Sequence, residues 1–138
     1  MNRHEPIQFL MTREVSSIQV NAPLSDARKL LAKAPFHHLP VCNGQTLVGI
    51  LSKTDIRALT LESFVTDPET VDAWLDQQHS IAQVMTYEPI VLRPTETIVK
   101  AAEYFASGEF HALPVVDERN HLVGMLTTTD IARWVASA

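Results

Sequence analysis

One stretch of ten residues occurs twice in this chain. Residues 47–56 read LVGILSKTDI, and residues 122–131 read LVGMLTTTDI. Each copy contains an apolar run of the length of a buried strand, and a Gly-x-x-Ser/Thr-x-x-Asp pattern that begins within this run and extends beyond it. Such a duplication indicates a repeat architecture, in which the units bury their apolar surfaces together.

The similarity extends outward from this stretch over most of both halves. With a shift of 74 residues, which becomes 75 after a one-residue gap near Asp117, seventeen positions are identical. They include the pairs Met11-Thr12 and Met85-Thr86, and Leu39-Pro40-Val41 and Leu113-Pro114-Val115. Residues 1–60 and 81–138 are therefore predicted to be two copies of one unit.

Each copy has the same predicted order of elements. Apolar runs predict strands at 17–20, 38–42, 47–51, 90–92, 112–116 and 122–126, and helical spacing predicts helices at 24–33 and 98–107 and from Lys53 and Thr128 onward. The fold class is thus α/β (α+β), with two βαββα units. Because a unit of about 60 residues buries only a modest core, we expect the two units to pack on each other about a pseudo-two-fold axis.

Residues 61–80 contain five acidic residues and no lysine or arginine. Asp67-Pro68 is a typical helix start, with aspartate as the cap and proline at the first helical position. Val71, Trp74, Leu75 and Gln78 then share one face. The segment is predicted to be an acidic linker helix whose acidic side lies in water, as a connector rather than a docking helix.

The composition limits the classes of protein to be considered. The chain has 138 residues, of which 46% are hydrophobic, and its 16 acids and 11 bases give a net charge of −5. A nucleic-acid binder would need a clustered basic excess, so this class is excluded. No apolar stretch has the length of a signal peptide or a membrane span, and we expect a cytoplasmic protein. The single cysteine, Cys42, is predicted to be a core residue.

The Gly-x-x-Ser/Thr-x-x-Asp pattern is the strongest candidate for a binding site. It places Ser52 or Thr127 at a helix N-terminus, where backbone N–H groups attract anions, and an aspartate three residues later could accept hydrogen bonds from a vicinal diol. The same spacing also describes a capping box. Because both copies follow the same kind of strand, we favour a binding site over a cap alone.

Catalytic and metal-binding motifs are absent from the sequence. It contains no nucleophile elbow, cofactor fingerprint, His-Glu-x-x-His or Cys-x-x-Cys spacing. His38 and Cys42 share a face of one predicted strand, but four residues of strand span about 13 Å, too far for one ion. We therefore predict no enzymatic activity and no metal site.

The motifs resemble a tandem pair of cystathionine-β-synthase (CBS) domains, a stand-alone Bateman module. The resemblance rests on Leu10-Met11-Thr12 and Val84-Met85-Thr86, on the two Leu-Pro-Val strands, and on the two Gly-x-x-Ser/Thr-x-x-Asp segments. It implies a regulatory module that needs no cofactor, binds adenosyl nucleotides (AMP, ADP, ATP or S-adenosylmethionine) in clefts between the units, forms a disc-like homodimer and signals to a separate effector protein.

The resemblance also implies roles for particular residues. Asp55 and Asp130 would bind ribose; Ser52, Thr127, Lys53, His37, His38 and His111 would face phosphate; and Thr12, Ser16, Ser17, Thr86, Ile90 and Val91 would flank adenine and ribose. Family members that bind polyphosphates often have arginine before the Leu-Pro-Val strand, where this chain has His38 and Ala112. Phosphate affinity would then depend on pH, because histidine titrates near neutrality.

Two expectations remain open from the sequence. Residues 1–60 carry a net charge of +3 and residues 81–138 a net charge of −3, so the site containing Ser52, Lys53 and Asp55 is predicted to bind phosphate better than the site containing Thr127 and Asp130. The alternative to a nucleotide sensor is a degenerate CBS pair that serves as a dimerisation or docking module without nucleotide.

Overall fold

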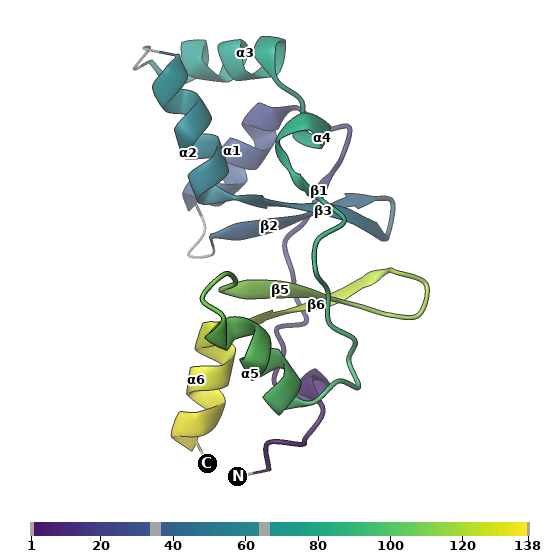
Figure 1. Ribbon diagram of the computed structural model, residues 1–138. Helices are drawn as coiled ribbons and strands as arrows, with labels where there is room; N and C mark the ends of the chain where they lie inside the picture. The colour runs from purple at the N-terminus through teal and green to yellow at the C-terminus, as the bar shows by residue number, and fades with distance from the viewer. Residues whose placement is uncertain (1, 34–36, 64–66, 138) are drawn as a thin grey trace. The chain divides into compact units, whose positions relative to one another are not determined.

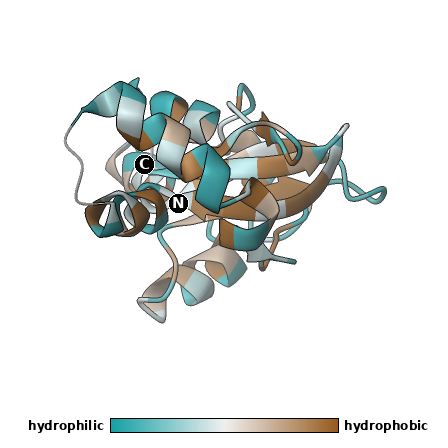
Figure 2. Ribbon diagram, turned by 90° about the horizontal axis from the view of Figure 1, so that it is seen from above, coloured by the Kyte–Doolittle hydropathy of each residue, from teal (hydrophilic) through white to brown (hydrophobic). Residues whose placement is uncertain are grey.

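The strands and helices of this chain form a mixed α+β fold (Figure 1). The computed structural model describes residues 2–33, 37–63 and 67–137, which contain six α-helices and two β-sheets. The chain divides into two compact units: residues 16–89, and residues 1–15 together with 90–138. The strands consist mostly of hydrophobic residues, whereas the helices mix hydrophobic and hydrophilic ones (Figure 2).

Unit 16–89 contains a four-stranded sheet with four helices. Its elements are β1 (Ile18–Gln19), α1 (Leu24–Lys33), β2 (His38–Asn43), β3 (Thr46–Ser52), α2 (Lys53–Glu62), α3 (Pro68–Gln78), α4 (Ile81–Val84) and β4 (Thr86–Tyr87). The strand order is β1-β2-β3-β4, with β1 parallel to β2 and the other pairs antiparallel.

The other unit repeats this plan with a shorter sheet. Its elements are the 3-10 helix η1 (Ile7–Phe9), α5 (Ile98–Ala106), β5 (Ala112–Val116), β6 (Leu122–Thr127) and α6 (Thr128–Ser137). Isolated bridges extend the β5-β6 pair on both sides, from Leu92 to Val115 and from Thr12 to Met125. The predicted strand at 90–92 is thus reduced to the single bridge at Leu92, while the predicted helix starts at Lys53 and Thr128 are confirmed.

The compact units do not coincide with the sequence repeats. The segment that begins the first repeat, including Ile7 and Met11, lies in the core of the unit that contains residues 90–138. Its counterpart in the second repeat, Ile81, lies in the core of unit 16–89. Each unit therefore takes its entry segment from one repeat and its central strands from the other.

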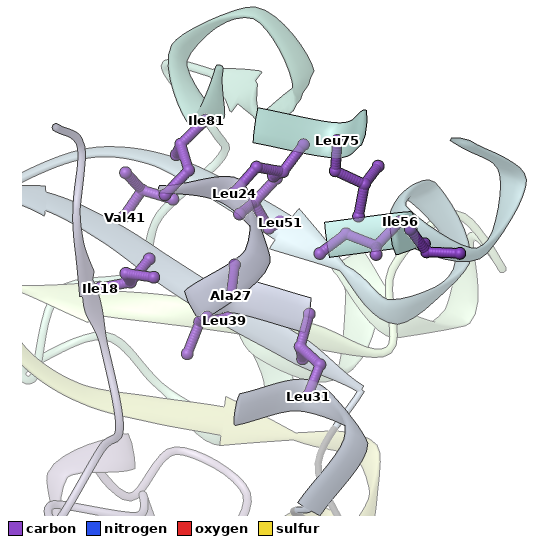
Figure 3. Close-up of a cluster of buried hydrophobic side chains, with 11 residues drawn as sticks. Ile18, Leu24, Ala27, Leu31, Leu39, Val41, Leu51, Ile56, Leu75 and Ile81 are labelled. Atoms are coloured by element: carbon purple, nitrogen blue, oxygen red, sulfur yellow. The ribbon is translucent and has the colours of Figure 1, made fainter. Parts of the chain in front are cut away.

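Each unit has its own apolar core. In unit 16–89 the core lies between the sheet and helices α1–α4, as Figure 3 shows, and includes Leu24, Leu51, Leu75 and Ile81. The members labelled there are Ile18, Leu24, Ala27, Leu31, Leu39, Val41, Leu51, Ile56, Leu75 and Ile81. The other core joins Ile7 and Met11 to Leu92, Ile98, Ala101, Leu113, Val115 and Leu126.

Helix α3 forms where the linker helix is predicted, with Asp67 as its cap and Pro68 in its first turn. Val71 and Leu75 are buried, but Gln78 at the end of the predicted face is exposed. The prediction that the acidic side lies in water does not hold for Asp72, which is half-buried, whereas Asp76 is exposed as predicted. Asp72 accepts hydrogen bonds from the Arg28 guanidinium of α1, and Asp76 accepts hydrogen bonds from the backbone N–H and the hydroxyl of Ser25 at 2.8 and 2.6 Å.

The contact between Asp72 and Arg28 should make the stability of this unit sensitive to acid. The hydrogen bond from Arg28 lowers the pKa of the Asp72 carboxyl. A lowered carboxyl pKa adds stability that is present above the unfolded value, about 3.9, and is lost as pH falls through the folded value. At neutral pH we expect Asp72→Asn to lower the free energy of unfolding by about 1 kcal/mol.

Urea unfolding of the wild type and of Asp72→Asn, repeated from neutral to strongly acidic pH, measures this effect. The difference between the two proteins should shrink as pH falls below the usual aspartate range. Glu69→Gln is a matched control on the exposed part of α3 and should change stability by less than about 0.5 kcal/mol. If the difference in stability stayed constant with pH, the stabilising effect of Asp72 would not come from its ionised carboxylate.

Candidate functional site

Two strand-to-helix turns hold the repeated Ser/Thr and Asp residues. At the start of α2 the backbone N–H of Asp55 donates to the Ser52 hydroxyl at 3.0 Å, and the backbone N–H of Ser52 donates to Asp55 Oδ2 at 3.3 Å. At the start of α6 the corresponding bonds between Thr127 and Asp130 are both 3.0 Å. Both turns are therefore complete capping boxes, so the capping interpretation of the sequence pattern is correct for both copies.

The turn at the start of α6 contains more than a cap. The Asp130 side chain is only 7% exposed, and its Oδ1 lies 3.5 Å from the Thr12 hydroxyl and 3.6 Å from Arg133 Nη1. Burial of a carboxylate is unfavourable unless hydrogen-bond donors and positive charge compensate it. Asp130 has such compensation from the α6 N-terminus, from Thr12 and from Arg133.

Thr12 reaches Asp130 because the N-terminal segment is attached to β6. The backbone groups of Thr12 and Met125 exchange two hydrogen bonds, both 2.9 Å long. Gly124, the residue before Met125, allows this close approach, because a Cβ atom there would lie 2.7 Å from Met11 Sδ and 3.0 Å from the Thr12 carbonyl oxygen. The glycine of the repeated motif thus has a packing role that brings Thr12 to the turn.

The turn at the start of α2 has the same plan with fewer contacts. Thr86, the counterpart of Thr12, pairs with Ile50 on β3, and a Cβ atom at Gly49 would lie 2.9 Å from the Thr86 carbonyl oxygen. Asp55 is half-buried, and its hydrogen bonds within the described part of the chain are those to Ser52. This carboxylate is accordingly more accessible than that of Asp130.

The histidines before the Leu-Pro-Val strands contact these turns through their backbones. The carbonyl oxygen of His37 accepts a hydrogen bond from the Lys53 N–H at 2.8 Å, and that of His111 accepts one from the Thr128 N–H at 3.0 Å. The side chains of His37 and His111 are exposed, and His38 is half-buried opposite Ser52. The sequence suggested side-chain roles and gave no signal for these backbone contacts.

The remaining predicted residues are divided between the two units. Thr12, Ile90, Val91, His111, Thr127 and Asp130 belong to the unit of residues 1–15 and 90–138, whereas Ser16, Ser17, His37, His38, Ser52, Lys53, Asp55 and Thr86 belong to unit 16–89. Ser16, Ser17, Thr86 and Ile90 are exposed, and Val91 is half-buried. His38, Ser52, Thr86 and Thr127 lie on strands, and Lys53, Asp55 and Asp130 lie in the first turns of α2 and α6. The others lie in the segments between these elements: Thr12, Ser16, Ser17, His37, Ile90, Val91 and His111.

Lys53 has surroundings different from those of Asp55. Its side chain lines a cavity between α1, α2 and α3, together with Arg28 and Arg57, and Asp55 is not part of that lining. At Asp130, by contrast, Arg133 supplies a cation beside the carboxylate. The expected basic advantage of the Ser52 site rested on the net charge of +3 over residues 1–60, and it stays a prediction.

The described residues were also compared with the requirements of a reactive thiol, a metal site and a membrane-spanning helix. Cys42 is 2% exposed, and burial raises the pKa of its thiol, which favours the protonated form over a reactive thiolate. No cluster of three or more His, Cys, Asp or Glu side chains among the described residues could hold a metal ion. None of the described helices is long and apolar enough to cross a membrane.

Comparison with known proteins identifies similar chains. A CBS domain-containing protein of Dictyostelium discoideum is 29% identical over 128 residues, which cover 91% of this chain and 87% of that protein. A homoserine O-acetyltransferase of Methanococcoides burtonii is 31% identical over 134 residues, but the match spans only 24% of the enzyme. This chain thus corresponds to about a quarter of the length of such enzymes.

Solved structures show the same fold. CBSX2 in complex with AMP, a protein of Arabidopsis thaliana, superimposes with a TM-score of 0.80 at 26% identity, covering 96% of this chain and 97% of CBSX2. The CBS domain pair of protein MJ0100, in complex with 5′-methylthioadenosine and S-adenosyl-L-methionine, has a TM-score of 0.74 at 23% identity, with 96% of each chain covered.

The family model of the CBS domain matches residues 7–62 and 81–137, so this chain belongs to the CBS domain family and contains a pair of CBS domains.

Proposed function

We propose that this CBS pair is a nucleotide sensor that binds an adenosyl nucleotide at the turns 52–55 and 127–130. The observation that carries the proposal is the buried Asp130 carboxylate, which lies beside the Thr12 hydroxyl, Arg133 and the α6 N-terminus. This combination suits a ligand with a diol and an anionic group. The likeness to CBSX2, which was crystallised with AMP, supports the same ligand class.

The aspartates of the capping boxes retain hydrogen-bond acceptor capacity for a ligand. A carboxylate has about four lone-pair sites, and in Asp130 the backbone N–H of Thr127 occupies one on Oδ2 and the Thr12 hydroxyl one on Oδ1. In our proposal Asp55 and Asp130 also accept hydrogen bonds from the ribose hydroxyls. The residues proposed to face phosphate are Ser52, Thr127, His37, His38 and His111, and those proposed to flank adenine and ribose are Thr12, Ser16, Ser17, Thr86, Ile90 and Val91.

The proposed mechanism is a change of packing that depends on the ligand. A nucleotide that binds one arrangement of the two CBS domains more tightly shifts the population toward it. In this proposal the module lies in the cytoplasm, forms a homodimer, needs no further cofactor and presents the changed surface to a separate effector. The enzymatic activities of longer relatives are not carried over, because their matches cover about a quarter of those chains.

Calorimetric titration with AMP, comparing the wild type with Asp130→Asn and Asp55→Asn, tests the ligand assignment. Asparagine keeps one oxygen for the cap but loses the charge and one acceptor, so we expect at least a tenfold loss of affinity at the altered site. Asp67→Asn, at the cap of α3, is the matched control and should bind AMP as the wild type does. Unchanged AMP affinity in both site variants would contradict the ribose role.

A docking module without nucleotide is the second candidate function. It is favoured by the fact that both aspartates already take part in capping boxes, which is sufficient reason for the fold to contain them. A thermal-shift series with AMP, ADP, ATP and S-adenosylmethionine separates the two candidates. Ligand at one hundred times its dissociation constant adds about 2.7 kcal/mol of stability, so a complete absence of shifts would favour the docking module.

A further inference from the structure

Helices α1, α2 and α3 of unit 16–89 border a cavity of about 510 Å³ that is open to solvent. Its walls combine apolar side chains, among them Leu31, Ile56 and Val71, with basic ones. Figure 3 shows Leu31 and Ile56 on neighbouring helices of this unit. Cavities of about 300–1,000 Å³ with apolar walls and a few polar groups are typical of small-molecule sites.

The charges on the walls all have one sign. Arg28, Lys53 and Arg57 line the cavity, and none of the described residues that line it is acidic. Arg28 is neutralised by Asp72, but Lys53 and Arg57 make no ion pair with any described residue. Lys53 is half-buried, whereas Arg57 is exposed at the mouth of the cavity. A half-buried cation next to apolar surface without a counter-charge is unfavourable, so an anion beside Lys53 would be stabilised.

The internal repeat shows that the fold does not need these cations. In the second repeat Thr128 and Ala132 occupy the positions that correspond to Lys53 and Arg57, and Ala102 corresponds to Arg28. The apolar positions are kept, however, since Leu31 corresponds to Phe105 and Ile56 to Ile131. The packing of two helices on the sheet therefore requires the apolar residues, whereas the basic residues belong to one copy alone.

We propose that this cavity binds an amphipathic organic anion. Lys53 and Arg57 hold a phosphate, sulfonate or carboxylate head group, and Leu31, Ile56 and Val71 contact the apolar body of the ligand. This site shares Lys53 with the turn at residues 52–55, but neither Ser52 nor Asp55 lines the cavity. The proposal does not depend on nucleotide binding by the CBS pair.

Fluorescence titration with 8-anilinonaphthalene-1-sulfonate, an amphipathic anion, tests the site on the full chain. We expect the double variant Lys53→Ala/Arg57→Ala to bind this probe at least tenfold more weakly than the wild type, because both charge-assisted contacts are lost. Lys33→Ala is the matched control, since Lys33 is an exposed base of α1 that does not line the cavity, and it should bind normally. The charge-conserving variant Lys53→Arg/Arg57→Lys should retain binding.

Displacement of the fluorescent probe by competing compounds tests whether the cavity prefers an amphipathic anion. Octyl phosphate should displace the probe, whereas 1-octanol and inorganic phosphate at the same concentration should not, because each lacks one of the two features. Equal probe affinity in the wild type and the double alanine variant, or equal displacement by octyl phosphate and 1-octanol, would overturn the proposal. Probe binding that disappears as the protein concentration rises would overturn it too, because a second copy of the chain would then occupy the cavity.

Discussion

Ile7→Ala should destabilise the unit formed by residues 1–15 and 90–138 by about 3 kcal/mol, the usual cost of a large-to-small change in a core. Ile7 is fully buried, and the core around it comes from the second sequence repeat, including Leu113 and Leu126. Alanine leaves a cavity that the central strands β5 and β6 cannot fill without losing their pairing. A substitution near the N-terminus thus weakens strands more than one hundred residues away.

Amide hydrogen exchange measures this effect strand by strand. Ile7→Ala should lower the protection of β5 and β6, and Ile81→Ala should lower that of β2 and β3, because Ile81 lies in the core of unit 16–89. Phe9→Ala is the control: its side chain is 69% exposed in the same 3-10 helix, so we expect a change within about 0.5 kcal/mol. Loss of protection in β2 and β3 after Ile7→Ala would show that the entry segment packs within its own repeat.

The local elements of this fold could be predicted from the sequence. Helix α1 at Leu24–Lys33 and strand β5 at Ala112–Val116 have the predicted bounds. Both follow from patterns that are complete within about ten residues, namely helical spacing and an apolar run next to turn residues. The same holds for α3, because Asp67-Pro68 specifies its start without any distant contact.

The pairing of distant segments could not be predicted in this way. Met11-Thr12 and Met85-Thr86 are identical, so nothing in the motif tells which of them pairs with β6. The contact of Thr12 with Asp130 joins residues that are 118 positions apart. Such a choice depends on the path of the chain and on packing around Gly124, and a one-dimensional pattern contains neither.

The charge around each candidate site also depends on side-chain direction. The net charge of +3 over residues 1–60 predicts more basic surroundings for the Ser52 turn, which contains Lys53. On the helix, however, Lys53 joins Arg57 one turn later in the cavity of the three helices, and Arg133 approaches Asp130 from three residues further along α6. Neighbours in sequence point to different faces of a helix, so a sum over a segment does not give the charge at a site.

Gly124→Ala and Gly49→Ala should each destabilise their own unit by about 1–3 kcal/mol, the usual cost of overpacking. A Cβ atom at Gly49 would lie 2.4 Å from Met85 Sδ and 2.9 Å from the Thr86 carbonyl oxygen. The methionine side chain can move, but the carbonyl belongs to β4, which pairs with β3 at this position. The added methyl group therefore has to separate the two strands.

Chemical unfolding together with a rescue variant tests the steric origin of this cost. Met85→Ala removes the flexible neighbour but leaves the Thr86 carbonyl, so the double variant Gly49→Ala/Met85→Ala should remain less stable than Met85→Ala alone. Gly44→Ala is the contrasting control, because Gly44 has a φ of +63° with nothing within 4 Å of a built Cβ. Its cost, about 1 kcal/mol, should come from backbone strain without any loss of protection in β4. If Gly49→Ala left the β3–β4 amides fully protected, the strands would tolerate the methyl group and close approach would not explain the glycine of the repeated motif.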